Sequence, residues 1–489
     1  MWHHFFVEAY PWFQRGRKGL EQGTSPIDKS SPRRVVGFAC NQGFVFFLFY
    51  MGYNRAYDFG PASFERVELV GALFFMVAAF VGLRLVSEDA KRGMFARPML
   101  LLYALMLAVG SLVPYSTGAG TGGGALVWLL AECFLVGSSS ALLLAAWGRS
   151  FGEAPTKVSV PEVFLASLFA ALFGLAVSFV PLSHTDLAFR VLPFVSAATL
   201  MAAPRRDGAP VKPAAASDGP TQEAALLSAK IIAGTALFGM AAGFMETFNT
   251  DPGMAAMPAY RIALLLLAAF AVGTLSLLLS DGFGKGASLN KSYRLAIFVM
   301  MLGFLLVPAP FFADSVVSGE AIVLAGYLGL SAVLISLFLV LASITDTSTT
   351  ASFSRGFAAL FGGEFIGIFL ANIINSTQPD QVTPYFVMVL AGALVLLSYL
   401  FLFTERDFGN LSEIVTSTDS FEDRCSSLIE QYGLSAREAE VLPFILKGRT
   451  SERISQELFI SKSTVETHFR RIYTKAGVHS RQELIDLSE

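Results

Sequence analysis

The sequence predicts an all-α protein in two parts, a bundle of twelve membrane-spanning helices followed by a small four-helix domain. Of its 489 residues, 54% are hydrophobic and only 15% are charged, against about 25% charged residues in soluble domains. Apolar runs of about 17–25 residues, the length that crosses a bilayer, recur from Val35 to Phe403. A large soluble enzyme would need far more polar surface than these runs offer, so we reject that interpretation.

The segment before the first apolar run, residues 1–34, is polar, aromatic and basic. We therefore expect a cytoplasmic N-terminal arm rather than a cleaved signal peptide. The three cysteines are too few and too far apart for a disulfide framework or a zinc site. We find no phosphate-binding loop, catalytic triad or metal-ligand spacing, and therefore expect no enzymatic activity, no cofactor and no metal.

The twelve apolar runs define a membrane domain over residues 35–403. The longest connection between them, residues 204–225, is rich in Pro, Ala, Gly and charge, and separates six runs from six as a cytoplasmic linker. This plan resembles that of the major-facilitator transporters, although the basic turn over residues 82–93 departs from the motif spacing of that family. The predicted spans are approximately 35–53, 67–86, 98–116, 124–147, 161–182, 187–203, 226–248, 259–280, 293–313, 320–343, 356–374 and 383–403.

Basic residues in the connections predict the orientation of the spans. The N-terminal arm carries six basic residues and alternate connections carry thirteen, whereas the intervening connections carry only Arg55 and Arg66. Because loops rich in Lys and Arg stay in the cytoplasm, both termini are predicted to be cytoplasmic, in the cell membrane. The C-terminal domain then lies on the side where DNA is found.

Ionisable side chains within apolar spans are costly, which makes each a candidate site. Glu132, Glu246 and Glu364 lie within predicted spans, and Asn372 adds a hydrogen-bonding group. We predict that some of them line a central cavity that binds a small ligand or a proton. The alternative is that each carboxylate is paired structurally or lies nearer a membrane face. The small-residue patterns at 239–243 and 363–367 predict close helix packing.

A polar linker, residues 404–427, leads to the C-terminal domain, residues 428–489. Capping and terminating residues divide this domain into four short helices, with a tight turn between the second and third. These residues are Ser435, Glu438, Gly448, Thr450, Ser461, Gly477, Ser480 and Glu483. Two helices joined by such a turn form a helix-turn-helix, whose second helix enters the DNA major groove.

The third helix of this domain has two distinct faces. Val465, Phe469, Ile472 and Ala476 form an apolar stripe, and the stretch from Ser461 to Arg481 has a net charge of +4. Charge concentrated on one helix is an electrostatic signature of DNA binding. The polar face opposite the stripe holds Ser463, Glu466, Thr467, Arg470 and Thr474, flanked by Lys462, His468, Arg471 and Lys475.

The segment from Leu434 to Asp486 resembles the LuxR-type (GerE-type) DNA-binding domain of bacterial transcription regulators. The resemblance rests on Arg437-Glu438, Ile460-Ser461, Thr464-Val465, Gly477-Val478 and other matching positions. It implies that the side chains after the Thr-Val pair, Glu466, Thr467 and Arg470, contact bases, while the flanking basic residues of the helix are expected to hold phosphates. The predicted DNA-binding residues are Lys462, Ser463, Thr464, Glu466, Thr467, His468, Arg470, Arg471 and Lys475. Position 466 is commonly Lys or Arg in the family but is Glu here, and a glutamate can accept a hydrogen bond from cytosine.

These observations together predict a bacterial, membrane-bound, one-component transcription regulator. The expected partners are double-stranded promoter DNA, the lipid bilayer, an unidentified small-molecule ligand, a second copy of the chain on DNA, and RNA polymerase. Two alternatives stay open at this point. The chain could be a major-facilitator transporter with a regulatory DNA-binding tail, or the tail could be a protein-interaction module without DNA affinity.

Overall fold

The computed structural model describes residues 31–50, 57–59, 62–111, 123–180, 182–202, 222–248, 257–280, 287–306, 319–344, 348–377, 383–397, 399, 421, 424–425, 427–458 and 460–487. The all-α prediction is confirmed, since helices dominate these residues. The sequence does not predict the short antiparallel hairpin in which β1 (Tyr57–Phe59) pairs with β2 (Ala62–Phe64). The predicted linkers, 204–225 and most of 404–427, lie outside the described residues.

Each of the twelve predicted spans coincides with a helix. The six helices of the first half are α3 (Ser31–Val45) continued by a π-helical turn η1 (Phe46–Tyr50), α4 (Val67–Leu85), α6 (Arg97–Gly110), α8 (Gly123–Gly152), α9 (Thr156–Val177) and α10 (Leu182–Met201). A short helix, α5 (Glu88–Met94), connects α4 to α6. The first helix begins four residues before the predicted edge, because Arg34 is buried against Glu162 of α9 and forms two hydrogen bonds of 2.7 Å with its carboxylate.

The six helices of the second half are α11 (Gln222–Phe248), α12 (Met257–Ser280), α13 (Ala287–Leu306), α14 (Gly319–Ile344), α15 (Thr349–Thr377) and α16 (Thr383–Leu397). Within the described residues of the whole chain, eight helices are long and apolar enough to cross a membrane. Large side chains such as Phe74 and Leu265 are more than half exposed on the outside of the bundle, as expected for a lipid-facing surface. The chain is therefore a multi-pass membrane protein.

The predicted close packing at the small-residue patterns is confirmed. Helices α11 and α15 pack together along their lengths, with Gly239 and Gly243 facing α15, and Gly363 and Gly367 facing α11. A Cβ atom added at Gly239 would lie 2.0 Å from the carbonyl oxygen of Leu360. Only glycine permits this approach of two backbones, so these residues fix the spacing of the two helices.

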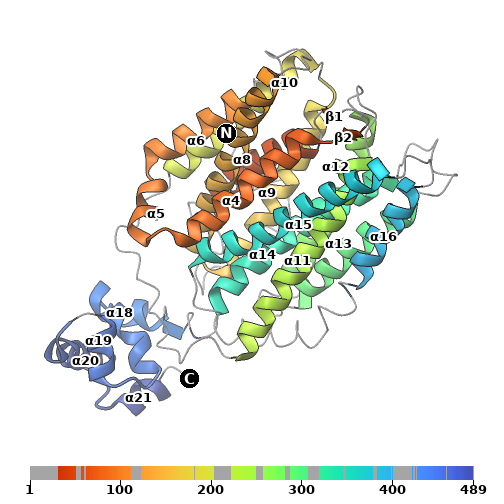
Figure 1. Cartoon of the computed structure of the whole chain (residues 1–489). Coiled ribbons are helices and arrows are strands. Elements are labelled where there is room, and N and C mark those ends of the chain that lie inside the picture. The colour runs from red at the N-terminus through yellow and green to blue at the C-terminus, as the bar shows by residue number, and fades with distance from the viewer. Residues whose placement is uncertain are drawn as a thin grey trace.

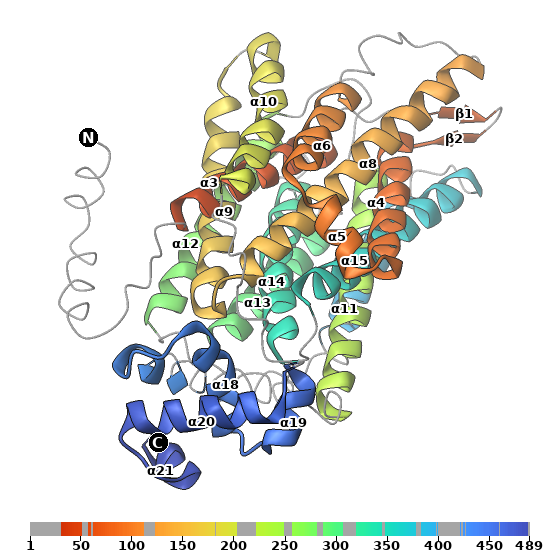
Figure 2. The ribbon, with the colours of Figure 1, turned by 90° about the vertical axis from the view of Figure 1, so that its left-hand side faces the viewer.

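The C-terminal domain consists of α18 (Ala436–Leu446), α19 (Ser451–Glu457), α20 (Lys462–Ala476) and α21 (Arg481–Asp486), the four helices that the sequence predicts. Its core joins the apolar faces of these helices to Leu428 and Tyr432, which precede α18. Figures 1 and 2 place this domain at one end of the bundle and the β1–β2 hairpin at the opposite end.

Candidate nucleic-acid interface and a buried polar cluster

Capping residues fix where α20 begins and ends. The Ser461 hydroxyl accepts a hydrogen bond of 3.1 Å from the Thr464 amide at the start of the helix, and Gly477 ends it in the left-handed conformation, with φ of 69°. Thr450 caps α19 in the same way through the Arg453 amide. At α21 the Ser480 hydroxyl accepts a hydrogen bond of 3.2 Å from the Glu483 amide, and the Glu483 carboxylate accepts one of 2.8 Å from the His479 amide.

The predicted apolar stripe of α20 faces the domain core. Val465 and Ile472 are fully buried, Ala476 is nearly so, and Phe469 packs against the same core from a half-buried position. This burial fixes the rotation of the helix about its axis. The polar residues on its opposite side therefore face outward as a set.

The outward side of α20 carries most of the predicted DNA-contacting residues in exposed positions. His468 differs, because its ring is half-buried and its Nδ1 atom is buried without a hydrogen-bond partner among the described residues. Arg470 and Arg471 form no ion pair within the part of the chain that the structure describes, so both guanidinium groups are available to a ligand. The exposed residues are Lys462, Ser463, Thr464, Glu466, Thr467, Arg470, Arg471 and Lys475.

Lys475 has an intramolecular role that the sequence did not reveal. Its ammonium group lies 2.7 Å from a carboxylate oxygen of Glu438 and donates a hydrogen bond of 2.9 Å to the carbonyl oxygen of Gly433. Glu438 is buried and also accepts from the Ser435 amide at 2.7 Å, and these contacts, Lys475 first, lower the pKa of its carboxyl to about 2. Lys475 thus ties α20 to the start of α18, and its contact with DNA stays a prediction.

Lys462 also pairs within the domain, but at the surface. Its ammonium group contacts the Glu452 carboxylate of α19, and both side chains are at least half exposed. Exposed pairs of this kind contribute little to stability and exchange partners easily. Lys462 therefore remains available to a phosphate group.

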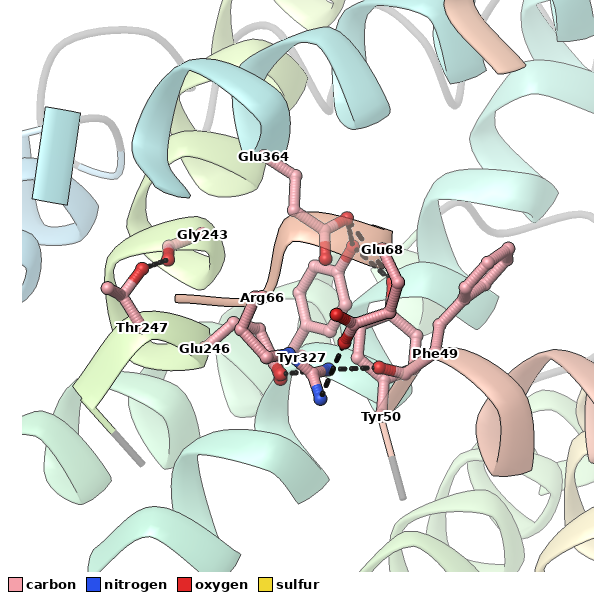
Figure 3. Close-up of polar contacts among 9 residues, drawn as sticks. All are labelled: Phe49, Tyr50, Arg66, Glu68, Gly243, Glu246, Thr247, Tyr327 and Glu364. Carbon is pink, nitrogen blue, oxygen red and sulfur yellow. Dashed lines mark hydrogen bonds and ion pairs between the residues drawn. The ribbon is translucent and has the colours of Figure 1, made fainter. Parts of the chain in front are cut away.

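A second group of polar side chains lies inside the membrane bundle, where the two halves meet (Figure 3). Its members, which we call the buried polar cluster, are Tyr50, Arg66, Glu246, Tyr327 and Glu364. Arg66 of the first half forms an ion pair of 2.8 Å with Glu246 of α11, and also donates to the carbonyl oxygen of Phe49. Tyr50 and Arg66 come from the first half, and the other three come from the second.

Glu364 occupies the other side of this cluster. One carboxylate oxygen, Oε2, accepts hydrogen bonds from the hydroxyl of Tyr327 at 3.0 Å and from that of Tyr50 at 3.3 Å. The two hydroxyl oxygens are themselves 3.1 Å apart. The tyrosine of η1 is thereby joined to α14 and α15 of the opposite half.

The structure brings Glu246 and Glu364 together but separates them from the other two candidates. Glu132 and Glu68 line a small cavity of about 30 Å³ within the first half, with Phe49, Ala72 and other apolar residues. Asn372 serves a structural purpose, because its amide group pairs with both backbone groups of Glu65 at distances of 2.6 and 3.2 Å. The four predicted residues therefore do not form one cavity.

The sequence prediction missed three members of the cluster, Tyr50, Tyr327 and Arg66, and only Arg66 had a signal in the sequence. It was counted as a loop residue, yet it is 1% exposed and has a left-handed backbone, with φ of 56°. The available signal was its position: Arg66 is a basic residue directly before a span, on the side of the membrane whose connections otherwise carry only Arg55. A basic residue in that place has no role in fixing orientation, which suggests a buried partner.

Comparison with known proteins identifies the C-terminal domain. The family described as bacterial regulatory proteins, luxR family, matches residues 433–488, so this segment is a LuxR-family helix-turn-helix domain. The Oxygen regulatory protein NreC of Staphylococcus aureus (strain JH9) is 47% identical over 53 residues. These residues are 11% of this chain and 24% of NreC, so the chain spans about a quarter of the length of that relative.

The bundle is similar in fold to a solved transporter. The human organic anion transporter MFSD10 (TETRAN) superposes with a TM-score of 0.51 at 13% sequence identity. The superposition covers 77% of this chain and all of the transporter chain. The transporter-like architecture predicted from the sequence is confirmed as a fold, and the similarity carries no information about a substrate.

Proposed function

We propose that this chain is a membrane-bound, one-component transcription regulator that binds promoter DNA through α20. The observation that carries the proposal is the outward face of α20, where exposed polar and basic side chains gather on a helix fixed by caps and core. That face belongs to a domain of a family of bacterial regulators. The charge pattern of the loops supports the cell membrane as its location, with both termini in the cytoplasm.

We assign separate roles to the two kinds of residue on this face. Lys462, Arg471 and His468 lie where phosphates would run, and contacts to phosphates set affinity rather than sequence preference. Glu466, Thr467 and Arg470 lie on the central face, from which side chains reach base edges. Arginine suits the paired acceptors of guanine, whereas glutamate can accept from the amino group of cytosine.

The remaining partners follow from this arrangement. We propose that two copies bind one DNA site, because symmetric sites position two recognition helices one turn of DNA apart. At a promoter, the DNA-bound copies would contact RNA polymerase. We also propose that the membrane domain responds to a small ligand, with the buried polar cluster between its halves as the responding element, since a ligand must bind two states of the protein with different affinity.

DNA binding can be tested with the full-length protein in lipid nanodiscs. Duplexes enriched from a random pool should bind the wild type, and Arg471→Ala should weaken all duplexes equally while reducing the slope of log affinity against log salt by about 1. Arg470→Ala should instead change which duplexes are enriched. Arg437→Ala, at an exposed position of α18, is the matched control and should leave binding unchanged. Enrichment of no sequence by the wild type would contradict the proposal.

The fold of the bundle favours a second candidate, a secondary transporter whose C-terminal domain regulates genes. Exchange of a labelled substrate across vesicles would distinguish the two candidates. A sensor shows saturable binding without exchange, whereas a transporter accumulates the label against an unlabelled pool.

A further inference from the structure

Two departures from regular backbone geometry meet at the buried polar cluster. The first helix ends in a π-helical turn, η1, which directs the carbonyl oxygen of Phe49 to Arg66. Arg66 itself has the left-handed backbone that side chains other than glycine rarely adopt. Such departures from regular geometry, beside ionisable groups in an apolar bundle, are concentrated at functional sites.

The cluster and its surroundings hold more carboxyl groups than basic groups. Arg66 is its one arginine, and the Glu246 carboxylate at 2.8 Å and the Glu68 carboxylate at 3.9 Å already share that cation. Glu364 forms no ion pair with it or with any other described residue. A carboxylate in this position lacks a positive partner, which is costly in a low-dielectric interior.

The hydrogen bonds of Glu364 leave one side of its carboxylate unused. Both tyrosine hydroxyls approach Oε2, whereas Oε1 is buried and has no hydrogen-bond partner among the described residues. The whole side chain is 0% exposed, so bulk water does not satisfy that oxygen. Oε1 can therefore accept from a further donor, and a donor with positive charge, or a proton, would also balance the unpaired carboxylate.

We infer that Glu364 Oε1 is a cation-binding site of the membrane domain, which takes a proton, a small monovalent ion or the ammonium group of an amine. The three share one chemistry, since each brings positive charge to the oxygen that lacks a donor. The rings of Tyr50 and Tyr327, whose hydroxyls approach Oε2, are 5.4 Å apart in an edge-to-face arrangement.

Occupancy of this site would act on the contact between the halves. The carboxylate that binds the cation also accepts the hydrogen bond from Tyr50 of the first half, so added positive charge weakens its hold on that hydroxyl. This consequence rests on the proposed regulatory function, whereas cation binding itself does not.

Thermal unfolding of the purified full-length protein in detergent tests the site. The probes are protons, supplied by a series of buffers from mildly acidic to mildly alkaline pH, sodium chloride, and n-butylammonium chloride. Choline chloride holds the ionic strength constant, because the quaternary nitrogen of choline has no N–H with which to donate a hydrogen bond to Oε1. We expect one probe to raise the Tm of the wild type by a few degrees, through selective binding to the folded state, without raising that of Glu364→Gln. Equal responses of the two proteins to all three probes would overturn the inference.

A second pair of variants keeps the test decisive if Glu364→Gln does not fold. Tyr327→Phe removes a donor from the carboxylate, so the half-maximal concentration of the effective probe should fall by about tenfold, the change expected for one hydrogen bond to a charged group. Tyr293→Phe, at a buried tyrosine of α13, is the matched control and should respond as the wild type does. The same response in Tyr327→Phe as in Tyr293→Phe would contradict the inference.

DNA binding measured on the same preparations separates this inference from the proposed function. A wild type that binds DNA but responds to none of the three probes would overturn the site at Glu364 alone. A cation response without DNA binding would overturn the regulator and leave the site standing.

Discussion

The C-terminal domain and the membrane bundle use polar side chains in opposite ways. In the C-terminal domain they cap helices and face solvent, as Ser461 and Arg470 do. In the bundle they are buried and pair across the two halves, as Arg66 does with Glu246. Water satisfies exposed polar groups in the first region, whereas in the second each group depends on a specific partner. The same kind of substitution should therefore have very different effects in the two regions.

Removal of Arg66 should have the largest effect. Arg66→Met leaves Glu246 buried without its ion-pair partner, which costs about 3–5 kcal/mol of stability. The measurement is the Tm of the full-length protein in detergent, and the double variant Arg66→Met, Glu246→Leu should regain most of the loss. A single variant as stable as the wild type would show that this buried pair behaves like an exposed one.

Close packing of glycines should give the next largest effect. Gly239→Ala forces α11 away from the Leu360 carbonyl of α15, at a cost of about 1–3 kcal/mol. Gly273→Ala in α12 is the matched control, because a Cβ atom there meets no atom within 4 Å. The control should leave the Tm unchanged or slightly raised, since alanine favours the helix. Equal Tm values for the two variants would contradict the account of this interface.

In the C-terminal domain, Glu438→Gln should have a smaller effect, about 1 kcal/mol, as for the loss of a helix cap. Hydrogen exchange in the first turn of α18 measures it in the full-length protein. The folded-state pKa of Glu438, about 2, lies below its ordinary value of 4.5, so its contribution is present above 4.5 and is lost as the pH falls towards 2. As the pH falls from 4.5 towards 2, the protection of that turn from hydrogen exchange should decline in the wild type but not in Glu438→Gln.

The surface pair of Lys462 and Glu452 should contribute least. Glu452→Gln should leave the Tm unchanged, because the pair is solvated. It should also raise DNA affinity by about threefold at low salt, since a competing negative charge is removed beside a phosphate contact. A measurable fall in Tm would show that this pair stabilises the domain.

The two regions also differ in how far the sequence predicts them. Caps and the apolar stripe are local patterns, so the sequence predicts α20, its buried face at Val465 and Ile472, and its exposed residues. Apolar runs likewise predict the twelve helices. Partners distant in sequence leave no local pattern, and the sequence therefore missed Lys475 with Glu438 and Arg66 with Glu246, 37 and 180 residues apart. Asn372 was placed in a cavity for the same reason, since its partner is the backbone of Glu65.

The central claim is that the C-terminal domain binds DNA while the bundle anchors it in the membrane. Cross-linking of the tagged full-length protein to DNA across the genome, in its own cells, tests this most directly. The control is the double variant Arg470→Ala, Arg471→Ala, which changes two exposed side chains and leaves the structural contacts of Lys475 intact. We predict discrete enriched sites that disappear in the variant while its level in the membrane is unchanged. Equal enrichment by both proteins, or none by either, would contradict the claim.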